Sequence, residues 1–386
     1  MVSAALLSIF FASFHAEFAA PRRLDPAADR VRTCGLGASF HAGRRTALCE
    51  RLGEGVVVLR GLPDTRDYRE FRQDKSFWYL TGVESRDAAL VMDAASGRAV
   101  LLLPERDREL QNEEVWNGEI WDASDEWVPG LTGFVEVRAN GKLLDVVSEL
   151  RGDAPDGVIW VLRYPAVQLA ESSDRAQKFE ARRRSDPLDG RDSRTGALEG
   201  ALEARFPDAQ VRDLQSELVA LRVHKTPEEL AALRRAAASS VAAMNEAIRS
   251  TKPGIGEWDL DALMRFVHQR NGAEGPAYEA IVGGGPNALV LHYLASDRVL
   301  RPNEMLLVDY ACERDHYTCD ITRSWPTSGE FTPRMLELYD AVLAAQLAGI
   351  AAAKPGVSLA EVSRVCQDVL RERGFDRLVL HGACHF

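Results

Sequence analysis

Two aspartates, Asp309 and Asp320, lie close together in the stretch LLVDYACERDHYTCDITRSW, which covers residues 306–325. Both lie in short runs that read as facing strands, where two carboxylates repel one another unless they share a proton or a metal ion. A shared proton would suit acid catalysis, and a shared metal would suit hydrolysis with imidazoles completing the coordination sphere. The chain offers three imidazoles for that purpose, His292, His381 and His385. Oxygen ligands with one nitrogen fit Mn²⁺ or a similar divalent ion better than a thiolate-rich zinc site does.

Spacing alone does not separate these chemistries from an ordinary structural role. Aspartates in a hairpin are usually turn or edge residues, and a single histidine on a strand is more often hydrogen-bonded than a ligand. A glycine run at 283–285 is followed by neither a Lys-Ser/Thr pair nor a helix, so a phosphate-binding loop is not indicated.

The six cysteines are dispersed and include no CxxC pair, which argues against a structural zinc site. A disulfide between Cys312 and Cys319 across a hairpin is an alternative. Dispersed thiols favour small buried residues in a reducing compartment instead.

Composition excludes some partners. The 386 residues carry a formal net charge of -11, so the chain offers no basic field for nucleic acid. No run after the N-terminal one approaches the ~20 apolar residues that a membrane span needs, so we expect no membrane partner. The apolar run from Ala4 to Phe14 lacks a basic flank and a good cleavage site. We therefore expect a cytoplasmic protein, with secretion as the alternative if residues 1–20 act as a signal peptide.

The N-terminal part reads as an α/β domain. Residues 41–60 predict a helix and then a strand, and short apolar runs predict strands at 88–93, 99–104 and 158–165. From Glu171 to about Gly200 the chain is polar and highly charged, which is typical of an insertion or linker.

The C-terminal part begins at a well-marked helix start. In HKTPEELAALRRA, Thr226 is a predicted N-cap, Pro227 the first helical residue and Glu229 the partner in a capping box. The remaining elements are, in order, a helix within 252–269, a strand–glycine turn–strand at 276–293, a hairpin at 304–326, helices within 332–353 and 358–374, and a strand that begins in LVLHGACHF at 378–386.

These motifs together resemble the pita-bread metallopeptidases. VDYACERDHYTCDITRSW is similar to their motif of two aspartates followed by Ile/Val-Thr-Arg, and LHGACHF is similar to their His-Gly-x-x-His motif. VLHY, with His292, resembles the histidine on the substrate side. FRQDKSFWYLTGV and RVHKTPEELAALRRA resemble the N-terminal domain and the start of the catalytic domain of the Xaa-Pro aminopeptidases (aminopeptidase P).

The resemblance implies a role for each matched residue. Asp309 would bind one metal ion through both oxygens, Asp320 would bridge two ions, and His385 would ligate one of them through a ring nitrogen. His292 and His381 would face the substrate as catalytic residues, and Cys384 reads as a packing residue. The implied cofactors are two divalent ions, with Mn²⁺ favoured over Zn²⁺ or Co²⁺.

In the family, two glutamates downstream of the last histidine motif complete the site, and no residue up to Phe386 matches them. We therefore expect a C-terminally truncated sequence with an incomplete catalytic sheet, inactive by itself. The expected division is 1–38 leader, 39–170 N-terminal α/β domain, 171–213 charged insertion or linker, and 214–386 α+β pita-bread domain, an antiparallel sheet with flanking helices.

The implied function is release of the N-terminal residue from peptides with proline in second position, through a hydroxide that bridges two metal ions. The resemblance also implies a homo-oligomer, and the expected partner is the peptide substrate. Three alternatives stay open. One is a prolidase, which cleaves only Xaa-Pro dipeptides, and another is a non-catalytic module that binds peptides or proteins. The third is C–N hydrolysis of the creatinase type.

Overall fold

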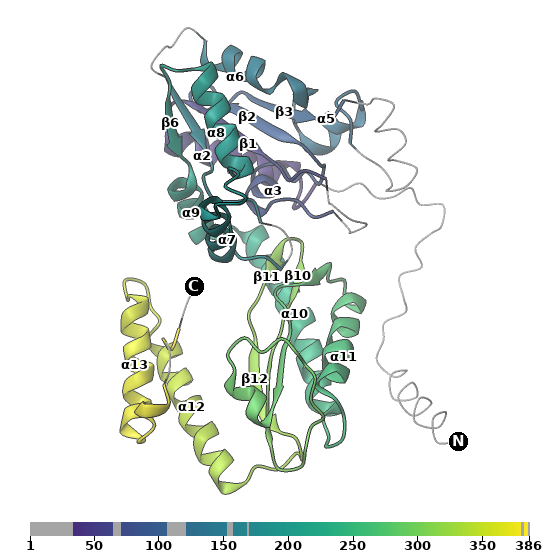
Figure 1. Ribbon diagram of the computed structural model, residues 1–386, viewed down its shortest axis with the longest axis vertical. Helices are drawn as coiled ribbons and strands as arrows, with labels where there is room; N and C mark the ends of the chain where they lie inside the picture. Colours follow the sequence, from purple (N-terminus) through teal and green to yellow (C-terminus); the bar gives the residue numbers. More distant parts are fainter. Residues whose placement is uncertain are drawn as a thin grey trace, which may run out of the picture.

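The computed structural model describes residues 34–64, 71–105, 121–152, 157–167, 170–379 and 382–384. In Figure 1 the described chain forms an N-terminal body, drawn at the top, and a C-terminal body below it. The short hairpin of β10 and β11 lies where the two bodies meet.

A six-stranded mixed sheet organises the N-terminal body, in the order β4-β3-β2-β1-β5-β6. Strands β1, β2 and β3 pair antiparallel, and the other neighbours pair parallel. The strands are β1 Val56–Arg60, β2 Ala89–Asp93, β3 Ala99–Leu103, β4 Glu136–Ala139, β5 Val158–Val161 and β6 Gln210–Asp213. The four apolar runs predicted as strands in this region are thereby confirmed as β1, β2, β3 and β5.

Both faces of this sheet are buried. Val57 and Leu59 of β1 belong to one apolar cluster and Val56 and Val58 to another, because successive side chains of a strand point to opposite faces. One face packs against helices α2 Ala38–Leu52, α3 Lys75–Thr81, α5 Trp127–Thr132 and α9 Gln215–Val223, and the other against α6 Leu143–Arg151 and α8 Arg194–Arg205. Burial on both sides explains why β1 is a continuous apolar run, and it confirms the predicted α/β class.

The charged segment expected as an insertion or linker at 171–213 contains regular structure. It forms helix α7, Ser173–Ser185, then α8 and β6. The Arg, Glu and Lys residues that make it polar are good helix formers, and so are its Ala residues; the prediction from composition did not consider helix propensity. Strand β6 pairs with β5, so the N-terminal sheet takes in residues on both sides of the boundary expected at 170.

In the C-terminal body, α10 (Pro227–Ser250) begins with the predicted capping box. The hydroxyl of Thr226 accepts from Glu229 N, and the Glu229 carboxylate accepts from Thr226 N at 2.8 Å. Helix α11, Glu257–Arg270, packs against α10 and covers a three-stranded antiparallel sheet in the order β12-β9-β8. Its strands are β8 Ile281–Gly284, β9 Met305–Asp309 and β12 Thr322–Pro326.

The predicted hairpin at 304–326 is a long two-stranded ribbon. Strands β9 and β12 form its base, and β10 (Cys312–Arg314) with β11 (Tyr317–Thr318) forms its outer end. Strand β10 also pairs with β7, Gly275–Pro276. The turn residues Asp315 and His316 have φ of 54° and 59°, the left-handed conformation that a two-residue hairpin turn requires. Cys312 and Cys319 are both free thiols.

The strand predicted to follow the glycine turn at 276–293 does not form. After β8 the chain makes a 3-10 helix, η2, at Gly285–Leu289 and then a turn. Pro286 is the second residue of η2, and it has no N–H to give to a strand ladder.

Helices α12, Pro333–Ala352, and α13, Leu359–Glu372, confirm the two predicted helices and pack on each other. By length and composition alone α12 could cross a membrane, contrary to the expectation that no run approaches that length. This is weak evidence, because helices of soluble proteins pass the same test. Only 17% of its most apolar window is buried here. The strand predicted at 378–386 lies partly outside the described residues.

Candidate active site

Asp309 and Asp320 converge on the hydroxyl of Tyr278. Asp309 ends β9, and Asp320 lies in the segment between β11 and β12. Tyr278 Oη donates to Asp309 Oδ1 at 2.6 Å and lies 3.3 Å from Asp320 Oδ1. The hydroxyl also accepts from Ile321 N at 3.3 Å, so the ribbon itself fixes the ring. The two aspartates from the opening motif are therefore close neighbours in space.

The pair of carboxylates has a high electrostatic cost. Burial raises the pKa of Asp309, the hydrogen bond from Tyr278 works against this, and the charge of Asp320 raises it further. Burial and the two aspartates also raise the pKa of Tyr278, so its proton stays on Oη at neutral pH. Asp309 is partly buried and Asp320 is exposed. Neighbouring carboxylate oxygens that repel each other suit a hard divalent cation, so these residues fit the metal that the resemblance implies.

His292 lies in the turn after η2, with an exposed side chain. Its Nδ1 atom is 3.4 Å from Arg175 Nη2 of α7. This contact joins the turn that carries His292 to α7 of the N-terminal body. Within the described part of the chain no three His, Cys, Asp or Glu side chains form a group that could hold a metal.

The other two predicted histidines, His381 and His385, lie outside the described residues. Between them, Ala383 N donates to Ser363 Oγ at 3.0 Å, and the Cys384 thiol donates to Leu359 O at 3.3 Å. These contacts tie residues 382–384 to α13 and agree with a packing role for Cys384.

Glu257, at the start of α11, organises the loop that carries His292. Its side chain is fully buried and accepts from Gly284 N at 2.7 Å, Tyr293 Oη at 2.8 Å and Arg298 N at 3.0 Å. Asn287 Nδ2 donates to it as well, at 3.1 Å. A buried carboxylate is stable only with such partners, so this one residue fixes both ends of the loop.

Sequence reasoning missed Tyr278 and Glu257. Tyr278 was visible in the stretch PAYEAIVGGG, but nothing in its spacing connects it with aspartates that follow far along the chain. Glu257 reads as an ordinary acidic residue in the first turn of a helix, where such residues are common.

Comparisons with known proteins agree with these features. Residues 231–386 match metallopeptidase family M24, and residues 41–159 match the N-terminal domain of aminopeptidase P. Xaa-Pro aminopeptidase of Escherichia coli is 29% identical over 338 residues, which cover 83% of this chain and 69% of the relative. Xaa-Pro aminopeptidase 2 of Streptomyces coelicolor is 30% identical, with 87% of this chain and 67% of the relative covered. For Xaa-Pro aminopeptidase 3 of Mus musculus, at 30% identity, the chain spans only 53% of the relative.

Solved structures show the same similarity. Aminopeptidase P of E. coli with the inhibitor Pro-Leu superposes with a TM-score of 0.69 at 26% identity, covering 87% of this chain and 73% of that chain. Zinc-substituted E. coli aminopeptidase P in complex with product superposes with a TM-score of 0.71 at 26% identity, covering 89% of this chain and 75% of that chain.

Proposed function

The chain belongs to the aminopeptidase P group of metallopeptidase family M24, and from this we propose that it is a metal-dependent Xaa-Pro aminopeptidase. The proposed reaction releases the N-terminal residue from a peptide whose second residue is proline. The observation that carries the proposal is the convergence of Asp309 and Asp320 on the Tyr278 hydroxyl.

Asp309, Asp320 and His385 are the proposed metal ligands. Mn²⁺ is the proposed ion because oxygen ligands predominate. Zn²⁺ and Co²⁺ are alternatives, and one similar solved structure is a zinc-substituted aminopeptidase P. When bound, the metal ions would acidify a water molecule for attack at neutral pH and polarise the scissile carbonyl.

The chain's own groups orient this site. Tyr278 keeps its proton at Oη and holds Oδ1 of Asp309, which limits rotation of the carboxylate. His292 and His381 are proposed to face the peptide on the family resemblance. Glu257 holds the loop of His292 in place.

Assembly and location are also proposals. A homo-oligomer is proposed on the resemblance to the family alone. A cytoplasmic location is supported by six free cysteines, with secretion as the alternative if residues 1–20 are a signal peptide.

The first test is a Mn²⁺ titration of the metal-free chain, with free Mn²⁺ followed by electron paramagnetic resonance. Asp309→Asn and Asp320→Asn should each weaken binding by about tenfold or more, because ligands must be ionised. Asp145→Asn is the control, since this side chain is 70% exposed in the N-terminal body. If the Mn²⁺ affinity is unchanged in both Asp309→Asn and Asp320→Asn, the proposed site is overturned.

The second test offers the Mn²⁺-treated chain an Xaa-Pro-Xaa tripeptide, an Xaa-Pro dipeptide and an Xaa-Ala-Xaa tripeptide. Release from the first tripeptide supports the aminopeptidase, whereas cleavage of the dipeptide alone indicates a prolidase. Metal binding without cleavage of any peptide would agree with the expectation that this sequence is inactive by itself, and it would keep the non-catalytic module as the alternative.

A further inference from the structure

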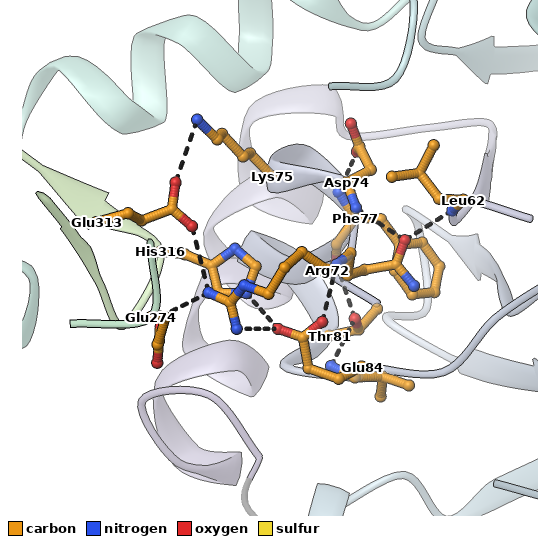
Figure 2. A network of polar contacts seen from close by, with 12 residues as sticks. Leu62, Arg72, Asp74, Lys75, Phe77, Thr81, Glu84, Glu274, Glu313 and His316 are labelled. Atoms are coloured by element: carbon orange, nitrogen blue, oxygen red, sulfur yellow. Dashed lines mark hydrogen bonds and ion pairs between the residues drawn. The ribbon is translucent and has the colours of Figure 1, made fainter. Parts of the chain in front are cut away.

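The outer end of the β9–β12 ribbon is buried against the N-terminal body (Figure 2). His316 lies in its turn, and its side chain is only 3% exposed. The imidazole stacks on Trp78 of α3, with 4.2 Å between ring centroids and 23° between planes. Its Nε2 atom contacts Glu84 Oε1. A turn residue of the catalytic part is thus held between an aromatic ring and a carboxylate of the other body.

A second set of contacts surrounds Arg72, whose side chain is 11% exposed. Its guanidinium bridges three carboxylates, with Nη2 at 2.6 Å from Glu274 Oε2 and 3.2 Å from Glu313 Oε1, and Nη1 at 3.3 Å from Glu84 Oε1. Lys75 Nζ lies 3.5 Å from the other oxygen of Glu313. Glu313 is fully buried on β10, so its charge depends on these two cations.

The two sets form one network through Glu84. Burial alone would raise the pKa of Glu84, but contacts with His316 and Arg72 hold it below its usual range. The carboxylate also accepts from Gln73 N at 2.8 Å, which fixes it on the N-terminal side. His316 and Glu313 are therefore both held by side chains of the N-terminal body.

The ribbon connects this network directly with the two candidate metal ligands. Asp309 precedes β10, Asp320 follows β11, and Tyr310 N donates to Ile321 O at 3.2 Å between them. The base of the ribbon is fixed by pairing of β9 with β8 and β12. The contacts with the N-terminal body hold the outer end of the ribbon as well. The two aspartates therefore lie between two fixed ends of the ribbon.

We propose that Arg72, Trp78 and Glu84 are positioning residues for Asp309 and Asp320, acting through His316 and Glu313 at the end of the ribbon. The expected effect on Mn²⁺ binding rests on the proposed metal site. The expected effect on the ribbon does not, because it is present in the metal-free protein. Helix α10 also contacts the outer end of the ribbon, where Arg235 Nε donates to Asp315 Oδ2 at 2.8 Å and Tyr317 Oη donates to Glu229 Oε1 at 2.9 Å. Loss of the N-terminal contacts should therefore loosen the ribbon without unfolding it.

The first experiment is hydrogen exchange of the full metal-free chain, followed by mass spectrometry of peptides that cover 309–322. Glu84→Gln removes the charge at constant shape, and His316→Asn removes the ring but keeps a residue that tolerates positive φ. Each variant should speed exchange of the Tyr310 amide by about tenfold, since that bond reports local opening. The effect of the double variant should be smaller than the sum of the two single effects, because both variants remove the contact between Glu84 and His316.

The control is Val147→Ala, in the apolar cluster on the far face of the N-terminal sheet. It should lower the melting temperature without changing exchange in 309–322. If Val147→Ala and Glu84→Gln affect that segment equally at matched melting temperatures, the network is merely structural and the inference is overturned.

The second experiment is the Mn²⁺ titration of the same proteins. Glu84→Gln and His316→Asn should weaken binding by about tenfold, as groups that orient metal ligands do, with no change for Val147→Ala. If Asp309→Asn abolishes binding but these variants leave it unchanged, only the positioning inference fails. If Asp309→Asn leaves binding unchanged, the proposed metal site fails, and the exchange data alone decide whether the network holds the ribbon.

Discussion

Tyr278, in the loop that joins β7 to β8, donates a 2.6 Å hydrogen bond to Asp309 at the end of β9. Burial and the nearby aspartates raise the pKa of the phenol, so it remains a donor at neutral pH. Burial and Asp320 push the pKa of Asp309 upward, and the hydrogen bond from Tyr278 counteracts them. The tyrosine therefore helps to keep Asp309 ionised, which is the form that binds a metal.

Tyr278→Phe should make Mn²⁺ binding more sensitive to acid. Without the phenol, the pKa of Asp309 rises further, so protons compete with metal at a higher pH. We expect weaker binding at acid pH and little change near pH 8, measured as Mn²⁺ affinity against pH. Tyr339→Phe on α12 is a matched control. Superimposable profiles for the wild type and Tyr278→Phe would show that the phenol does not govern ionisation of Asp309.

Asp309→Asn should separate stability from metal binding. In metal-free protein the substitution removes repulsion from Asp320, so the free energy of unfolding should stay constant or rise by about 1 kcal/mol. Mn²⁺ at a hundred times its dissociation constant should stabilise the wild type by about 2.7 kcal/mol. The variant should lose this gain, measured by denaturant unfolding with Mn²⁺ or with EDTA. An equal gain in both proteins would contradict a role for Asp309 as ligand.

Local patterns in the sequence predicted the elements that carry the site. The capping box at Thr226 and Glu229 needs only residues three positions apart, and the ribbon of Asp309 and Asp320 needs only alternating strands and a turn. Such features form within one segment, so the sequence encodes them locally. The polar segment at 173–205 was misjudged because its charge was weighed and its helix propensity was not.

Contacts between distant segments were not predictable in this way. Arg72, in the segment before α3, meets Glu274 and Glu313 only because the N-terminal body packs on the outer end of the ribbon. Glu257 bonds to Gly284 and Arg298 only once α11 covers β8. No periodicity or spacing in one sequence specifies such pairs, since they depend on how whole elements pack.

Glu257→Gln should destabilise the loop that carries His292. The amide offers only one acceptor oxygen, and its NH₂ group would face donors that the carboxylate now satisfies. Leaving buried donors unpaired should cost about 2–4 kcal/mol in the free energy of unfolding. Hydrogen exchange across 284–298 should rise more than in α13. Glu361→Gln, at an exposed site on α13, is the control, and equal behaviour of the two variants would contradict this role.

Acid should weaken the N-terminal body through His41. This fully buried ring accepts from Leu36 N at Nε2 (3.1 Å), and its Nδ1 is 3.0 Å from Tyr79 O. The neutral ring therefore donates from Nδ1 and accepts at Nε2, and a proton on Nε2 would face the Leu36 N–H. Burial lowers the pKa of His41 to about 4 from 6.5.

Because the folded pKa is lower than the unfolded one, the unfolded chain takes up a proton first as the pH falls. The stabilising contribution is present above pH 6.5 and is lost progressively down to about pH 4, for a total of about 3 kcal/mol. Denaturant unfolding at intervals between pH 7.5 and 4.5 gives the free energy of unfolding as a function of pH. In His41→Gln the slope of this curve should fall by the equivalent of up to about one bound proton. His224→Gln at an exposed site should keep the wild-type slope. If His41→Gln also keeps that slope, His41 is protonated in the folded protein and the hydrogen bond from Leu36 does not hold it neutral.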